Sequence, residues 1–291
     1  TGHTKTGFPF NRIPPDSWDS HMHVTDPVKY TLAKGAQYMP QTHLLSEALK
    51  FEKSLGLRNV VLVQPSIYGT DNTCMLDALR ALGPNHGRAV VAFDPETIDP
   101  STLQYWHQLG VRGVRVNTQS IGKHMREEEM VTILHRYADI IRPYNWVLQL
   151  YVPLDAVIIL EKVVPKLGVT VCLDHFGSPA LNGRLNFGDP YSLPGFQSLV
   201  NLLLQGTTYV KLSAPYRICQ DEAWKDLEPV AKELVRVAGM SRAVFASDWP
   251  HTRFEGLDIK PYIEALIEWC GNDDALLERV FKGNAETLWG V

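Results

Sequence analysis

Two histidines separated by one residue stand near the start of the chain, in the segment Asp19-Ser20-His21-Met22-His23. Side chains on a β-strand alternate between its two faces, so both imidazoles of an extended segment point into the same space. Such a pair can hold a metal ion or polarise a carbonyl group. The alternative is that both are surface histidines in an N-terminal loop.

Three further polar clusters favour the first interpretation, because each also stands at the end of an apolar run. They are Tyr151, Asp174-His175 and Ser247-Asp248-Trp249-Pro250-His251. Strand ends that repeatedly carry polar side chains are typical of barrel enzymes, whose active sites lie at the carboxyl ends of the strands. Other polar residues at predicted strand ends are Gln64, Ser66, Asp94, Arg115, Asn117, Tyr216 and Arg217. We expect all of them to face one rim.

Short apolar runs alternate with helical patterns along the chain. The runs are rich in Val, Leu and Ile, as expected for strands buried on both faces, and predict strands at residues 17–24, 59–64, 89–94, 113–117, 147–151, 169–174, 209–213 and 243–247. Helices are predicted at residues 44–55, 72–82, 101–109, 127–142, 154–167, 195–204, 224–238 and 259–270. Eight such pairs predict an α/β fold, a closed (β/α)8 TIM barrel, with an open doubly wound sheet as the alternative. Neither GxGxxG nor GxxxxGK[ST] follows the first strand, which counts against a nucleotide-binding open sheet.

One domain is the simplest division of the 291 residues, because no break in composition interrupts them and a typical barrel has ~250 residues. Residues 1–16 are predicted to be an N-terminal extension, and residues 274–291 a C-terminal helix that closes the structure. Residues 25–43 and 177–194 are long connections after the first and sixth strands. Both leave the carboxyl ends of strands, so we expect them to be active-site loops.

Composition limits the kind of partner. A net charge of −4 argues against nucleic acid and against anionic membranes, and favours a small-molecule substrate. No stretch approaches the ~18 apolar residues of a membrane span. The four cysteines are widely spaced, and so low a density favours a reducing compartment, so we expect a cytoplasmic protein. The sequence does not predict the oligomeric state.

Nine short segments, taken in their order along the chain, resemble the amidohydrolase superfamily, within its branch of lactonases like 2-pyrone-4,6-dicarboxylate lactonase. The matching segments are His21-Met-His23, Val63-Gln-Pro-Ser66, Tyr68-Gly-Thr-Asp-Asn72, Arg112-Gly-Val-Arg115-Val-Asn117, Leu173-Asp-His175-Phe-Gly177, Val210-Lys-Leu-Ser213, Tyr216-Arg217, Ser247-Asp-Trp-Pro-His251 and Asn284-Ala-Glu-Thr-Leu-Trp-Gly290. The HxH pair alone is weakly specific, whereas the ordered set is specific. The resemblance implies an amidohydrolase-2 type barrel that opens a lactone or pyrone-type cyclic ester.

The resemblance also bears on a metal. Superfamily members add histidines on strands 5 and 6 and an aspartate on strand 8 to the HxH pair. Here strand 5 ends in Tyr151, and strand 4 carries Arg115, which cannot bridge cations. The set that remains could hold one Zn²⁺ with an open position: His21, His23, His175 and Asp248. A nearby guanidinium would oppose that cation, and the lactonases that the chain resembles work without metal. We therefore expect no required metal, and a weakly occupied zinc site is the alternative.

Hydrolysis of a lactone needs an attacking water, a base and donors for the developing oxyanion. Asp248 is the proposed base. The proposed donors to the carbonyl oxygen are His21, His23 and His175. The residues expected to bind the substrate are Arg115 and Arg217, which would anchor an acidic substituent, and Ser66, Tyr38 and Tyr151, which would orient the ring.

Each role has a structural competitor. The alternatives are a helix cap for Asp248, a packed core position for His175, interior packing for Tyr151 with its hydroxyl bonded to Asp174, and an internal ion pair between Arg115 and Asp94. His251 follows Pro250 in a loop and is expected to be structural.

The chain departs from the pattern of the dicarboxylate lactonases at two positions. Ser178 stands where that pattern has an arginine after strand 6, and only Lys123 could replace a second arginine after strand 4. A substrate carboxylate would then be poorly paired in a desolvated pocket. We therefore expect a less acidic and more aromatic lactone, with a rim formed by Phe176, Trp249, Tyr38 and Phe187.

Three other functions stay open. A zinc-dependent non-oxidative decarboxylase of an aromatic or unsaturated acid shares the HxH pair and the strand-8 aspartate, but should also need a histidine at strand 5. A non-hydrolytic barrel could catalyse dehydration or ring closure. The chain could also be a non-catalytic binding barrel.

Overall fold

The computed structural model describes residues 11–117, 126–181 and 188–291. Eight parallel strands form one sheet in which each strand pairs with the next along the chain. The strands are β1 (Trp18–Met22), β2 (Asn59–Val63), β3 (Gly87–Val91), β4 (Val111–Asn117), β5 (Val147–Tyr151), β6 (Val171–Leu173), β7 (Thr208–Leu212) and β8 (Ala243–Phe245). A bridge between Met22 and Trp249 and a hydrogen bond from Asp248 N to His21 O (2.9 Å) join the first strand to the segment after the last.

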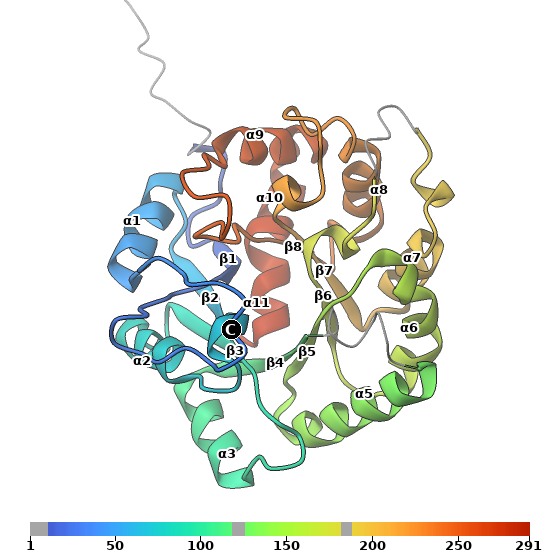
Figure 1. Ribbon diagram of the computed structural model, residues 1–291. Helices are drawn as coiled ribbons and strands as arrows, with labels where there is room; N and C mark the ends of the chain where they lie inside the picture. Colours follow the sequence, from blue (N-terminus) through green and yellow to red (C-terminus); the bar gives the residue numbers. More distant parts are fainter. Residues whose placement is uncertain (1–10, 118–125, 182–187) are drawn as a thin grey trace, which may run out of the picture.

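Helices surround the ring of strands (Figure 1). They are α1 (Leu45–Leu55), α2 (Thr73–Leu82), α3 (Pro100–Leu109), α5 (Glu127–Ile141), α6 (Val157–Val163), α7 (Phe196–Gln205), α8 (Glu228–Ala238), α9 (Lys260–Trp269), α10 (Asp274–Glu278) and α11 (Asn284–Trp289). This arrangement is the predicted (β/α)8 TIM barrel.

The predicted boundaries differ from the structure at several elements. The third strand begins at Gly87 and ends at Val91, because the Asn72 side chain takes both backbone groups of the next residue: Ala92 N donates to Asn72 Oδ1 at 2.9 Å, and Asn72 Nδ2 donates to Ala92 O at 2.8 Å. The predicted C-terminal helix is two short helices, α10 and α11, joined by a π-helical turn over Arg279–Gly283. Residues 1–10 of the predicted extension lie outside the described part of the chain.

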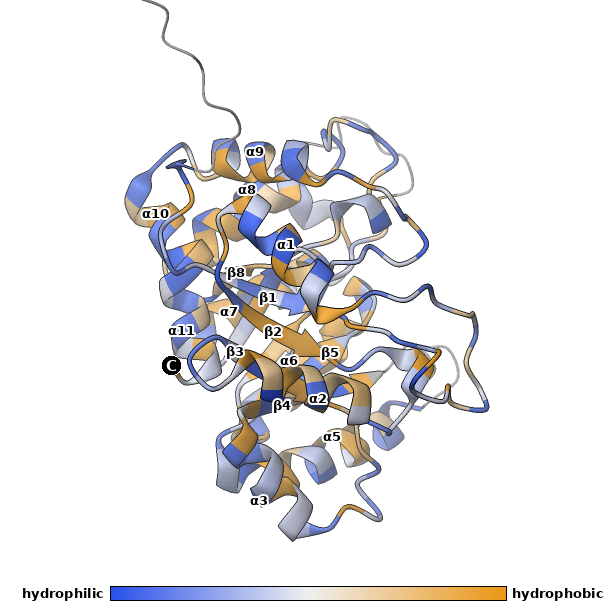
Figure 2. Cartoon of the chain, turned by 90° about the vertical axis from the view of Figure 1, so that its left-hand side faces the viewer, coloured by the Kyte–Doolittle hydropathy of each residue, from blue (hydrophilic) through white to orange (hydrophobic). Residues whose placement is uncertain are grey.

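The apolar core has two layers. The larger layer lies between the strands and the outer helices; in Figure 2, β2 is hydrophobic along its length, whereas α1 has both hydrophobic and hydrophilic residues. The second layer fills the inside of the barrel and includes Val61, Val90 and Val244. Trp289 of α11 belongs to this inner layer, so the C-terminal helix closes one end of the barrel.

Polar side chains lie further along the same inner face. On β7, Tyr209 belongs to the inner apolar layer, and Lys211 and Ser213 follow it at intervals of two residues, on the same face of the strand. On β5, Gln149 and Tyr151 follow in the same way. Gln149, Lys211 and Ser213 are fully buried. The two-residue period of the strands therefore leads from an apolar layer to a polar one.

The four cysteines are unpaired, and three of them are buried. Within the described residues, no helix combines the length and the apolar character that crossing a membrane requires.

A buried aspartate ties the first strand to the end of the last. Asp19 Oδ1 accepts hydrogen bonds from Ser247 N at 2.8 Å and from His21 N at 3.1 Å, and Asp19 Oδ2 accepts another from Ser247 Oγ. Glu52 of α1 is buried beside it, and neither of its carboxyl oxygens has a hydrogen-bond partner among the described residues. Burial, and then the neighbouring Asp19, raise the pKa of Glu52 well above its usual range.

Replacing Glu52 with Gln should raise the free energy of unfolding at neutral pH, by about 1 kcal/mol or more. Above its ordinary pKa of 4.5, the unfolded chain releases a proton that the folded chain retains, so Glu52 makes the protein less stable as the pH rises. The neutral amide removes that effect. Urea unfolding of both proteins between about pH 5 and about pH 8 measures the two slopes.

The matched control is Glu264→Gln on the exposed face of α9, which should leave the wild-type slope unchanged. A Glu52→Gln curve parallel to that of the wild type would contradict the assignment of this buried acid.

Candidate active site

A cavity of about 520 Å³ lies at the carboxyl ends of the strands. Eight of the nine predicted site residues line it: His23, Tyr38, Ser66, Arg115, Tyr151, His175, Arg217 and Asp248. The ninth, His21, is fully buried and is not part of the lining. Residues from the first strand to the end of the eighth therefore meet around one space.

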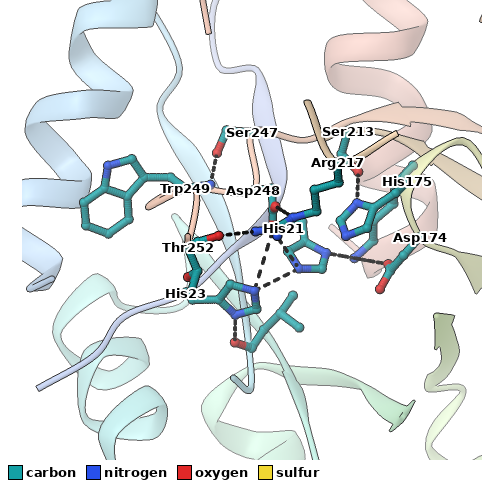
Figure 3. Close-up of polar contacts among 12 residues, drawn as sticks. His21, His23, Asp174, His175, Ser213, Arg217, Ser247, Asp248, Trp249 and Thr252 are labelled. Atoms are coloured by element: carbon teal, nitrogen blue, oxygen red, sulfur yellow. Dashed lines mark hydrogen bonds and ion pairs between the residues drawn. The ribbon is translucent and has the colours of Figure 1, made fainter. Parts of the chain in front are cut away.

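Asp248 is held through one of its two carboxylate oxygens (Figure 3). Oδ2 accepts hydrogen bonds from Tyr216 Oη at 2.5 Å and from Arg217 Nε at 2.7 Å. Oδ1 faces His21 Nε2 at 3.6 Å and His23 Nε2 at 3.7 Å. Burial by itself raises the pKa of Asp248, but the nearby His175 imidazole and Arg217 guanidinium outweigh burial and hold this pKa well below its usual range. The carboxylate is therefore ionised, with Oδ1 turned towards the imidazoles.

The three histidines are buried and neutral at neutral pH. Burial is the main cause and lowers the pKa of His23 to about 4, that of His21 well below its usual range, and that of His175 as well. The Nε2 atoms of His21 and His23 lie 3.2 Å apart, His23 Nδ1 is 2.7 Å from Val63 O, and His175 Nδ1 is 2.7 Å from Ser213 Oγ. Each ring is thus fixed by at least one hydrogen bond.

The backbone is strained at two of these positions. His175 follows β6 with φ 51°, and Asp248 follows β8 with φ 59°, both in the left-handed region. Such conformations cost of order 1–3 kcal/mol and cluster at functional sites, where the surrounding contacts hold them in place. Here they turn an imidazole and a carboxylate towards the same cavity.

The two predicted anchoring arginines differ in how much of their hydrogen-bonding capacity is used. Arg217 is engaged by Asp248, and its Nη2 also donates to Thr252 O at 3.1 Å. Arg115 Nη1 donates to Gln64 O at 3.2 Å, whereas its Nε is buried without a hydrogen-bond partner among the described residues. Arg115 is therefore the less committed guanidinium of the two.

The alternative prediction of an ion pair between Arg115 and Asp94 is wrong. Asp94 is exposed in the turn after β3 and does not line the cavity. The carboxylate near Arg115 is instead Asp174, whose Oδ2 lies 4.0 Å from Arg115 Nη2.

The prediction that four aromatic residues form the rim of the cavity is wrong for two of them. Phe176 is fully buried and Trp249 is 8% exposed, and neither lines the cavity. Phe187 lies outside the described residues. Tyr38 does line the cavity, together with Arg253, whose guanidinium carbon lies 5.0 Å from the centre of the Tyr38 ring. Arg253, which no sequence motif singled out, adds a third positive charge to this space.

The two predicted active-site loops contribute unequally. Residues 25–43 supply Gly35, Gln37 and Tyr38 to the cavity lining. In the second loop, the described residues 177–181 and 188–194 do not line it, and residues 182–187 lie outside the described part. Lys123, the expected replacement for a missing arginine, lies outside the described residues as well.

The spacing of three side chains fits a zinc ion. His21 Nε2, His23 Nε2 and Asp248 Oδ1 are separated by 3.2, 3.6 and 3.7 Å, and tetrahedral bonds of ~2.0–2.1 Å place ligand atoms roughly 3.3 Å apart. The fourth expected ligand, His175, groups instead with His21 and Asp174. The geometry therefore fits a three-residue set with an open position.

The structure adds a buried polar group that the sequence analysis did not assign to the site. Lys211 Nζ lies 2.7 Å from Gln149 Oε1, 3.2 Å from His21 Nδ1 and 3.5 Å from Asp174 Oδ1. A signal was present, because Lys211 stands two residues before Ser213 and so shares its inward face. A lysine inside an apolar strand run marks a buried charge that must be paired.

The fold and this cavity place the chain in the amidohydrolase class of barrel enzymes. The profile of the amidohydrolase family matches residues 18–291, so the chain belongs to that family.

Three relatives carry informative names. The chain is 30% identical over 286 residues to 4-sulfomuconolactone hydrolase of Hydrogenophaga intermedia, covering 96% of this chain and 90% of that one. It is 26% identical to 2-pyrone-4,6-dicarboxylate hydrolase of Comamonas testosteroni, covering 82% and 78%. The crystal structure of a candidate 2-pyrone-4,6-dicarboxylic acid hydrolase from Pseudomonas putida superposes with a TM-score of 0.78 at 28% identity, covering 96% and 98%. These names favour hydrolysis over decarboxylation, dehydration and ring closure.

The free energy of unfolding should decrease as the solution becomes acidic, partly because of His251. This ring is buried against Phe51 and Tyr216, and burial lowers its pKa to about 4 from 6.5. As the pH falls from 6.5 to about 4, the unfolded chain binds a proton that the folded chain excludes, so up to about 3 kcal/mol of stability is lost. His251→Asn should therefore lose less stability over this interval than the wild type, measured by urea unfolding at both ends.

The control is His135→Asn on the outer helix α5, which should show the wild-type dependence on pH. An equal loss in the wild type and in His251→Asn would show that His251 does not report on this transition.

Proposed function

We propose that this enzyme hydrolyses a lactone or pyrone-type cyclic ester that carries acidic substituents. The observation that carries the proposal is the Asp248 carboxylate, which lines the cavity beside neutral imidazoles with one oxygen left for a proton. The names of the relatives support the ester chemistry. Arg115, Arg217 and Arg253 around the same cavity support an acidic substrate and replace our expectation of a less acidic one.

The proposed reaction begins with a water molecule held at Asp248 Oδ1. Asp248 takes one proton of this water while the oxygen of the water attacks the lactone carbonyl carbon. His175, whose Nδ1 is bonded to Ser213, donates from Nε2 to the developing oxyanion. When the tetrahedral intermediate collapses, the bond to the ring oxygen breaks, and that oxygen receives the proton from Asp248. The products are a carboxylic acid, which ionises to a carboxylate by releasing its proton to solvent, and a hydroxyl or enol group on the same opened chain.

The low pKa of Asp248 makes it a weak base in the free enzyme, and substrate binding offsets this. Arg217 is one of the groups that lower that pKa. An acidic substituent that pairs with the guanidinium groups neutralises part of their charge, so the carboxylate holds a proton more firmly when the substrate is bound. The base is thereby strengthened at the moment when it is needed.

The substrate-binding roles follow from the same cavity. Arg115, whose side chain lines the cavity and is 14% exposed, binds an acidic substituent, and Arg253 binds a second one at the rim. Ser66, Tyr38 and Tyr151 orient the ring through their hydroxyl groups.

The reaction requires no metal in this proposal. Should Zn²⁺ bind, His21, His23 and Asp248 would hold it, and it would polarise the carbonyl group. The positive charges of Arg115, Arg217 and Lys211 surround that position and oppose a cation. The four free cysteines support a cytoplasmic location.

Asp248→Asn should lower kcat for lactone hydrolysis by about 10²- to 10⁴-fold, because the amide cannot accept the proton of water. Binding of the lactone, measured by calorimetry, should be retained. The matched control is Asp94→Asn, which changes an exposed carboxylate in the turn after β3 and should leave kcat unchanged. Unchanged turnover in Asp248→Asn would remove the assignment of the base.

Arg253→Met should lower kcat/KM for a lactone with two acidic groups by about 10- to 100-fold, the cost of losing a hydrogen bond to a charged group. For a lactone with one acidic group the change should be small, since Arg115 remains. Arg58→Met, at an exposed ion pair with Asp16, is the control. Equal losses for both substrates would show that Arg253 does not select the second group.

A further inference from the structure

The ammonium group of Lys211 lies inside the barrel with three acceptors around it. It hydrogen-bonds with Gln149 Oε1 at 2.7 Å and His21 Nδ1 at 3.2 Å. It also forms an ion pair with Asp174 Oδ1 at 3.5 Å, an oxygen that has no hydrogen-bond partner among the described residues. Lys211 is fully buried, as are Gln149, His21 and, at 2% exposed, Asp174. An ammonium has three N–H donors and no acceptor, so each partner must offer a lone pair.

The orientation of the Gln149 amide agrees with this assignment. Gln149 Nε2 donates to Asp174 Oδ2 at 3.2 Å, so its other atom, Oε1, is the acceptor that faces Lys211. The amide and the carboxylate therefore hold the ammonium in a fixed position beside His21.

The contact of His23 with the backbone, at the opposite end of the histidine pair, also fixes the position of a proton. The carbonyl oxygen of Val63 can only accept, so His23 Nδ1, 2.7 Å away, carries the proton. A neutral His23 then has a lone pair at Nε2. His21 Nε2 lies 3.2 Å from it and must supply the hydrogen in that contact. A neutral His21 protonated at Nε2 has its lone pair at Nδ1, which is the atom that faces Lys211.

We propose that Lys211 is a positioning residue that fixes His21 as the tautomer protonated at Nε2. One directed chain of hydrogen bonds then runs from Lys211 through His21 and His23 to Val63 O. The competing arrangement protonates His21 Nδ1 and directs it to Asp174 Oδ1, which is 3.6 Å away and beyond a normal hydrogen bond. That arrangement would also leave Lys211 with one acceptor fewer and set two lone pairs against each other between the histidines.

The fixed tautomer has a consequence for metal binding. A zinc ion held by His21, His23 and Asp248 needs a lone pair on both Nε2 atoms. Lys211 places a proton on one of them, so zinc can bind only after His21 changes tautomer and Lys211 loses its hydrogen bond. Lys211 thus keeps a geometrically suitable metal site weak, whichever substrate the enzyme acts on.

The first test uses the unmodified protein. Long-range ¹H–¹⁵N correlation spectra of metal-free, ¹⁵N-histidine-labelled enzyme distinguish the two neutral tautomers of each ring. His21→Gln identifies the signals of that residue. His21 should be protonated at Nε2 and His23 at Nδ1. A spectrum with His21 protonated at Nδ1 would overturn the proposal, and this measurement decides it even if substitutions at Lys211 fail to fold.

The second test changes the donor. Lys211→Met has a side chain of similar length without N–H groups, so His21 should switch to the tautomer protonated at Nδ1 and directed to Asp174. Zinc affinity, measured by titration with Zn²⁺ in a metal buffer, should increase at least 10-fold. Lys211→Arg retains a donor and should keep the wild-type tautomer and weak zinc binding.

The control for this series is Lys232→Met, which removes an exposed lysine paired with Glu228 on α8. It should change neither the His21 spectrum nor zinc binding. An unchanged tautomer in Lys211→Met would overturn the role of Lys211, and an unchanged zinc affinity in a variant that has switched tautomer would overturn the link to metal binding.

Discussion

An ionised carboxylate can be buried only where donors and positive charge replace the water that it loses, and the site depends on this constraint at Asp248. Tyr216 and Arg217 donate to one oxygen of the carboxylate. The remaining oxygen faces His21 and His23. The same contacts that stabilise the charge in the folded state therefore decide which atom is left to meet a water molecule or a substrate.

Along the barrel axis, the apolar layer that stabilises the fold and the cavity that holds the polar site residues lie at opposite ends. At one end, Trp289 and the inner valines form an apolar layer. Above it, Lys211, Gln149 and Asp174 are joined by two hydrogen bonds and one ion pair. The cavity lies beyond this polar layer, so its side chains are supported from below by groups that are themselves fixed.

Positive charge near the cavity has two effects that act together. It lowers the proton affinity of Asp248 in the free enzyme and favours an acidic ligand, because Arg115, Arg217 and Arg253 lie around the same space. It also opposes a metal cation at the histidines. In the proposed reaction an anionic substrate relieves the first effect, whereas a metal ion would increase the repulsion.

The pattern of residues along the chain was enough to predict the barrel and most of the cavity lining. Alternating apolar runs and helical patterns specify a (β/α)8 fold, and residues at the carboxyl ends of its strands must meet at one rim, so His23, His175 and Asp248 could be named in advance. Tertiary structure decided the partners of those residues. The exposure of Asp94, the approach of Arg253 from a loop and the contact between Lys211 and His21 depend on how far each strand extends and how the loops return. Spacing along one strand fixes which face a side chain takes, but not which group from another strand stands opposite to it.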